Sequence, residues 1–165
     1  GAEEVVLGLG GSATTDAGFG MAQALGVRFL DGTGEPVADP RRLAEVARAD
    51  LSGLDARVRS VRFVAASDVT NPLLGPDGAA AVFGPQKGAV PSDIALLDEG
   101  LLRWSRALRA AGLHADPAVP GAGAAGRDAG ASPEGAGIAV VAMVPGQSAS
   151  RTPSSRARAA ASGQP

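Results

Sequence analysis

A glycine-rich turn near the start of the chain has the composition of an anion-binding site. Gly8, Gly10 and Gly11 are followed by Ser12 and Thr14. Glycines let a ligand approach backbone N–H groups, and such groups at a helix N-terminus attract anions. The hydroxyl groups add hydrogen-bond donors. We therefore expect Gly10, Gly11, Ser12 and Thr14 to bind a phosphate or carboxylate group, with a purely structural turn as the alternative.

Three charged side chains are candidates for chemistry. Asp68 follows an expected buried strand, at the end where open α/β sheets place their ligands, with Thr70 and Asn71 just beyond it. Asp16 starts an expected helix, where a carboxylate also serves as a cap. Lys87 lies in a Pro- and Gly-bounded loop and suits a contact to phosphate, although an ordinary exposed lysine is the alternative.

The same turn also fits dinucleotide binding. Gly8 to Ala13 satisfies the pattern G-x-G-x-x-A after a strand, and Asp31 ends the next strand, where a ribose-binding acid belongs. Against this alternative, Asp31 to Gly34 favour a hairpin turn, whereas a Rossmann unit continues through another crossover helix. The residues alone leave an NAD(P)-dependent oxidoreductase open.

Composition excludes several other classes. The 165 residues contain no Cys and one His, which removes disulfides, thiolate catalysis and clusters of Cys or His around a metal. A net charge of −2 gives no electrostatic footprint for nucleic acid, and no apolar run reaches the roughly 20 residues that span a bilayer. We expect a cytoplasmic protein with a small-molecule substrate and no nucleic-acid or membrane partner; the sequence indicates no oligomeric state.

The elements that must position these residues alternate between strand and helix, which predicts an α/β fold: an incomplete sheet with flanking helices. Gly1 to Gly126 should form this unit, and 127–165, rich in Ala, Ser, Pro and Arg, should be disordered or read out of frame. The expected elements are buried strands at 3–9 and 61–66, a strand at 27–30, a helix from Asp16 to Leu25, and helical segments at 40–47, 79–83 and 92–108.

The expected helix at 92–108 has the clearest periodicity. Its apolar residues step by three and four, so they should form a buried stripe, with Ser92 as the cap; the stripe comprises Ile94, Leu97, Leu101, Trp104 and Leu108. Gly100 inside this helix costs about 1 kcal/mol relative to Ala.

The chain contains six segments, among them Gly8 to Asp16 and Ser67 to Pro76, that together and in order resemble the bacterial glycerate kinases. Gly8 to Asp16 is similar to the family's Gly-Gly-Ser-Ala-Thr-Asn-Asp signature, with Thr15 in place of Asn, and Ser67 to Pro76 to its Asp-Val-Thr-Asn-Pro-Leu loop. Further matches are Ala24 to Asp31, Asp50 to Asp55, Val82 to Ala89 and Pro120 to Gly126.

The resemblance implies ATP-dependent phosphorylation of D-glycerate with Mg²⁺, in a two-domain α/β protein. It makes Asp68 the leading candidate to activate the glycerate hydroxyl or to hold Mg²⁺, and Asp16 the second. Lys87 would neutralise charge on the transferred phosphoryl group. The family's N-terminal Asp-Ser-Phe-Lys-Gly segment is absent here, so we expect a fragment with little turnover of its own, or a non-catalytic remnant.

Overall fold

The computed structural model describes residues 1–9, 13–66 and 69–123, with only the backbone of 64–66. The expectations for Gly10, Gly11, Ser12, Asp68 and the tail therefore lie outside the described residues. Mixed helices and strands confirm the α/β class. In chain order the elements are β1 (Glu4–Gly8), α1 (Phe19–Ala24), β2 (Arg28–Leu30), the 3₁₀ helix η1 (Pro40–Glu45), β3 (Arg48–Asp50), the 3₁₀ helix η2 (Ala56–Arg59), β4 (Arg62–Ala66), α2 (Ala79–Phe83), the 3₁₀ helix η3 (Pro85–Lys87) and α3 (Pro91–Ala110).

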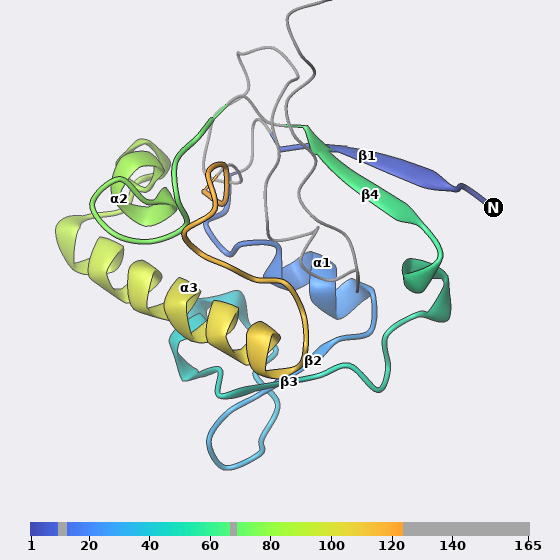
Figure 1. The fold of residues 1–165 in the computed structure, drawn as a ribbon. Helices are drawn as coiled ribbons and strands as arrows, with labels where there is room; N and C mark the ends of the chain where they lie inside the picture. The colour runs from blue at the N-terminus through green and yellow to red at the C-terminus, as the bar shows by residue number, and fades with distance from the viewer. Residues whose placement is uncertain (10–12, 67–68, 124–165) are drawn as a thin grey trace, which may run out of the picture.

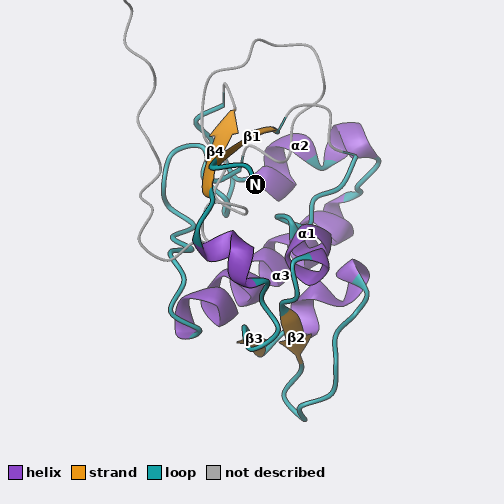
Figure 2. Ribbon diagram, turned by 90° about the vertical axis from the view of Figure 1, so that its right-hand side faces the viewer, coloured by secondary structure: helices purple, strands orange, loops and turns teal. Residues whose placement is uncertain are grey.

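The described strands form two separate pairs. β1 and β4 are parallel, whereas β2 and β3 are antiparallel. The two pairs lie toward opposite ends of the molecule, with α1 and α3 between them (Figures 1 and 2). The core fills this central region, and the rings of Phe19 and Phe29 stack at 4.6 Å between α1 and β2. No helix within the described ranges is long and apolar enough to cross a membrane.

The expectation of a buried first strand is wrong for Val6. Its side chain is 61% exposed, although β1 pairs with β4 along its whole length, from Glu4 beside Arg62 to Gly8 beside Ala66. Parallel strands are usually covered on both faces, which is why an apolar run predicts burial. Here the described residues leave one face of β1 open.

The hairpin expected after β2 is confirmed. The N–H of Val37 donates to the carbonyl of Phe29, and the carboxylate of Asp31 accepts hydrogen bonds from the N–H groups of Thr33 and Glu35. A further strand, β3, completes the antiparallel pair with β2. It was not expected, because Arg48 to Asp50 is too short to show any periodicity.

This topology removes the dinucleotide-binding alternative. That alternative requires β2 to follow β1 in one parallel sheet, but β1 pairs with β4 and β2 belongs to the other sheet. The carboxylate of Asp31, which would hold a ribose, is occupied by its own turn: its Oδ1 accepts from the N–H of Thr33 at 2.8 Å and from the Thr33 hydroxyl at 2.7 Å.

The apolar stripe of the last helix is confirmed as core in its second half, whereas Ile94 and Leu97 are only partly buried against that core. Leu101, Trp104 and Leu108 are at most 1% exposed. The expected cap is wrong: α3 begins at Pro91, so Ser92 lies inside the first turn, and the carboxylate of Asp93 accepts from the N–H of Val90 at 3.0 Å instead. Proline suits the first helical position because the N–H that it lacks has no partner within the helix.

The glycine in the middle of α3 has a packing reason. A Cβ at Gly100 would lie 3.2 Å from the backbone nitrogen of Ala44 and 3.2 Å from the Cβ of Leu43. The missing side chain thus lets η1 lie directly against α3, which offsets the loss of helix propensity. Gly100 and Leu43 are both buried at this contact.

The stability of the fold should be sensitive to substitution of Gly26. Its φ is +98°, and a Cβ there would lie 2.0 Å from the carbonyl oxygen of Gly53. Positive φ and a backbone collision both penalise a side chain, so Gly26→Ala should lower the free energy of unfolding by about 3 kcal/mol. Gly34 is the matched control, because its φ is +92° with open space around it. Gly34→Ala should lower the free energy by only about 1 kcal/mol. Urea unfolding measures both, and equal losses would contradict the role given to the Gly53 contact.

Candidate active site

Two candidate segments follow strands that end side by side. Gly8 at the end of β1 is the register partner of Ala66 at the end of β4. Gly10 comes two residues after the first strand, and Asp68 comes two residues after the second. The carboxyl edge of a parallel pair is where ligands bind in open α/β sheets, so the strands leading to these segments have the expected arrangement.

The segment after the glycine-rich turn is held by Asp16. Its carboxylate accepts from the Thr14 hydroxyl at 3.0 Å and from the N–H groups of Gly18 and Gly20 at 3.3 Å each. These last two groups belong to the start of α1, where N–H groups lack partners within the helix. Both carboxylate oxygens of Asp16 are therefore used for capping in this structure.

Lys87 reaches the same segment from a distant part of the chain. It ends η3, and its Nζ donates to the backbone carbonyl of Thr14. η3 follows α2 directly, and the N–H of Ala89 donates to the carbonyl of Gly84 to close the loop. Two sequence-predicted site residues, Thr14 and Lys87, are thus brought together across more than 70 positions.

A cavity of about 410 Å³ opens beside this contact. One wall is the loop of Lys87, and another is formed by Ala13 and Thr15. The early turns of α3 contribute Asp93, Leu96 and Leu97, and η1 contributes Arg41. Two cations, one carboxylate, two leucines and a backbone segment adjacent to the glycine-rich turn therefore surround one space.

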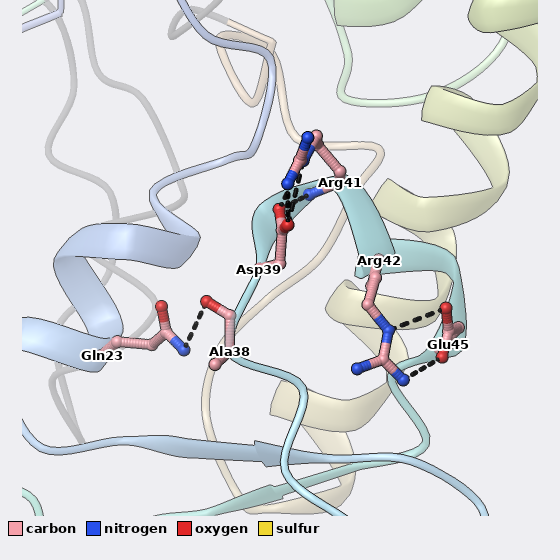
Figure 3. Close-up of polar contacts among 6 residues, drawn as sticks. All are labelled: Gln23, Ala38, Asp39, Arg41, Arg42 and Glu45. Carbon is pink, nitrogen blue, oxygen red and sulfur yellow. Dashed lines mark hydrogen bonds and ion pairs between the residues drawn. The ribbon is translucent and has the colours of Figure 1, made fainter.

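Arg41 was not among the sequence-predicted site residues. It lies at the start of η1, where its Nε and Nη2 contact the carboxylate of Asp39 at 2.5 to 3.0 Å (Figure 3). The Arg41 guanidinium holds the pKa of Asp39 at about 2, so this pair is charged at neutral pH. The sequence shows only an Asp-Pro-Arg helix start, and no local pattern places Arg41 near Lys87.

Thr70 and Asn71 do not line this cavity. Their loop is fixed elsewhere: the Asn71 side chain donates to the carbonyl of Asp77 at 2.9 Å, and its own carbonyl accepts from the N–H of Gly123. From α3, the carboxylate of Asp98 accepts from the N–H of Gly75 at 3.0 Å. The described structure thus holds this loop firmly but does not join Asn71 to Lys87.

Within residues 1–9, 13–66 and 69–123 no three His, Cys, Asp or Glu side chains group to hold a metal. Mg²⁺ commonly takes only one or two carboxylates, with phosphate oxygens and water as its other ligands. Both oxygens of Asp16 accept hydrogen bonds, and Asp93 is the carboxylate among the described residues that line the cavity. Asp68, the metal ligand expected from the sequence, lies outside the described residues.

Comparisons with known proteins agree with each other. The sequence pattern of the glycerate kinase family matches residues 1–153. A glycerate kinase from Halalkalibacterium halodurans is 49% identical over 127 residues, which are 76% of this chain and 33% of that protein. The glycerate 2-kinase of Escherichia coli is 45% identical over 128 residues, with the same two shares.

A solved structure shares the fold. The crystal structure from Salmonella typhimurium LT2, described as a glycerate kinase 2, superposes with a TM-score of 0.70 at 47% identity. The match covers 75% of this chain and 33% of that one. The chain thus spans about a third of the length of the relatives that it matches.

Proposed function

Because this chain belongs to the glycerate kinase family, we propose that it forms part of an enzyme that transfers a phosphoryl group from ATP to D-glycerate. The proposed setting is the cytoplasm, where ATP is available. The observation that carries the proposal is the contact between Lys87 and Thr14 beside a cavity of about 410 Å³. It places a fixed cation next to the segment that leaves the glycine-rich turn, where anionic groups of substrate or nucleotide would bind.

The roles follow from what phosphoryl transfer demands. The transferred group carries charge on its equatorial oxygens, so positioning and electrostatic stabilisation supply most of the catalysis. Gly10, Gly11, Ser12 and Thr14 would hold an anionic group, and Lys87 would neutralise charge on the phosphoryl group. Thr70 and Asn71, which do not line the cavity beside Lys87, would contribute polar contacts outside it, from the loop after β4.

Asp68 would accept the proton of the glycerate hydroxyl, or hold Mg²⁺, at the carboxyl edge of β4. The oxygen of the hydroxyl then bonds to phosphorus, while the bond from phosphorus to the bridging oxygen of ADP breaks. Mg²⁺, when bound, would neutralise phosphate charge. Asp16 is the second candidate for catalysis, but its contacts with Gly18 and Gly20 favour the capping role.

A chimera tests this function. This chain would replace the matching third of Escherichia coli glycerate 2-kinase, with which it shares 45% identity over 128 residues. We expect the chimera to release ADP from ATP only when D-glycerate is present, and the 165-residue chain alone to show little turnover. ADP release is measured by a coupled assay, with L-lactate as the control acceptor.

Two results would contradict the proposal. One is a folded chimera that binds ATP but does not phosphorylate D-glycerate. The other is equal turnover with L-lactate, because that acceptor lacks the second hydroxyl group and an enzyme built for glycerate should discriminate against it.

A further inference from the structure

We infer that the cavity between the Lys87 loop and α3 binds the phosphate chain of a nucleotide, with Arg41 as a second cationic contact in addition to Lys87. The inference rests on the proposed function for its choice of nucleotide. It adds a residue from η1 that is separated from Lys87 by more than 40 positions but lines the same space.

The charges in the lining favour an anion. Lys87 and Arg41 are its two cations, and Asp93 is the one carboxylate that the described lining contains. Asp93 is already used at the start of α3, where it accepts from the N–H of Val90. Asp39 binds the Nε and one terminal nitrogen of Arg41, but a guanidinium has a second terminal nitrogen that carries two N–H donors. Arg41 can therefore hold Asp39 and a phosphate oxygen together.

Size and polarity favour a nucleotide over glycerate. A volume of about 410 Å³ falls within the range of pockets for ligands as large as drugs, far larger than a three-carbon acid needs. Besides Asp93, α3 contributes the apolar side chains of Leu96 and Leu97 to the lining, and Leu96 is 65% exposed. An exposed leucine beside two cations suits a ligand with a flat apolar base at one end and phosphates at the other.

The fold fixes Arg41 in its place. Gly100 lets Leu43 pack directly on α3, so the position of η1 is set by the core. The segment before η1 is tied to α1, because the Gln23 side chain donates to the carbonyl of Ala38 at 3.3 Å (Figure 3). Arg41 itself stays 88% exposed by side chain and can contact a ligand.

The chain contains a matched control in Arg57. It occupies the same position in η2 and holds Asp55 as Arg41 holds Asp39, with identical side-chain exposures of 88% and 35% in the two pairs. The pKa of Asp55 is likewise lowered to about 2 by its arginine. Arg57 lines a different cavity of about 340 Å³, away from Lys87. Substitution of either arginine should thus lower the free energy of unfolding by about the same amount.

The test titrates the 165-residue chain with ATP, tripolyphosphate and D-glycerate and follows amide resonances by NMR. ATP and tripolyphosphate should shift the amides of Gly84, Gly88 and Ala89, and D-glycerate should not. Arg41→Met should weaken the binding of both phosphate compounds by about 10-fold, the value of one charge-assisted hydrogen bond, while Arg57→Met changes it less than twofold. Leu96→Ser should weaken the binding of ATP but not that of tripolyphosphate.

The outcomes separate this inference from the proposed function. No shift at the cavity amides, or equal weakening by Arg41→Met and Arg57→Met, would overturn it even if the chimera phosphorylates glycerate. Binding of tripolyphosphate as tight as ATP, with no effect of Leu96→Ser, would overturn the choice of a nucleotide. ATP binding that depends on Arg41 would support the inference even if the chimera transfers no phosphate to glycerate.

Discussion

Asp68→Asn should lower kcat of the chimera with ATP and D-glycerate by two to four orders of magnitude. A general base contributes roughly 10²–10⁴-fold, and an amide oxygen is too weak a base to replace a carboxylate. The position supports the expectation: Asp68 follows Ala66, whose register partner Gly8 leads to the glycine-rich turn. Substrate hydroxyl and phosphate donor would thus meet at one edge of β1 and β4.

Asp16→Asn is the control variant for Asp68→Asn. Asp16 accepts hydrogen bonds from Thr14, Gly18 and Gly20, so its carboxylate stabilises the start of α1. An asparagine keeps one oxygen acceptor and caps a helix nearly as well. We therefore expect Asp16→Asn to lower the free energy of unfolding by about 1 kcal/mol and to lower kcat less than 10-fold. The coupled ADP assay and urea unfolding measure both quantities. Near-normal turnover of Asp68→Asn would remove Asp68 from the mechanism, and a larger loss for Asp16→Asn would exchange the two roles.

The elements that the sequence predicted well are those with long or strongly marked patterns. The stripe from Leu101 to Leu108 lies buried because its period matches the helix, and the turn at Asp31 formed because its side chain bonds the backbone two and four residues on. The expected burial of Val6 was wrong. An apolar run indicates that side chains favour a core, but it does not indicate whether other elements of the fold cover them.

Candidate site residues could be proposed from the sequence where their chemistry is local. Thr14 and Lys87 each belong to a segment with a recognisable composition, and the structure joins them. Arg41 belongs to no such segment. Its place in the lining of the cavity that Lys87 also lines depends on the packing of Leu43 against Gly100, a contact between residues more than 50 positions apart. No pattern within η1 could reveal that contact.

Lys87→Met should lower kcat/KM of the chimera by about 10²- to 10³-fold, the usual effect of removing one preorganised group that stabilises charge in the transition state. The backbone contact of Lys87 with Thr14 positions its charge before the substrate binds, and this preorganisation is what makes such a group effective. Lys87→Arg keeps the charge but changes the shape of the donor group, so it should recover part of the rate.

The sequence allows an independent measurement of the same role. Lys87 is the only lysine in the chain, so an amine-specific reagent modifies it and the N-terminal amine alone. If Lys87 contacts phosphate, ATP should slow its modification at least several-fold, whereas D-glycerate should not, and the N-terminal amine provides the internal control. A Lys87→Met chimera with normal kcat/KM, or a rate of modification that ATP leaves unchanged, would show that Lys87 serves only to hold the Thr14 segment in place.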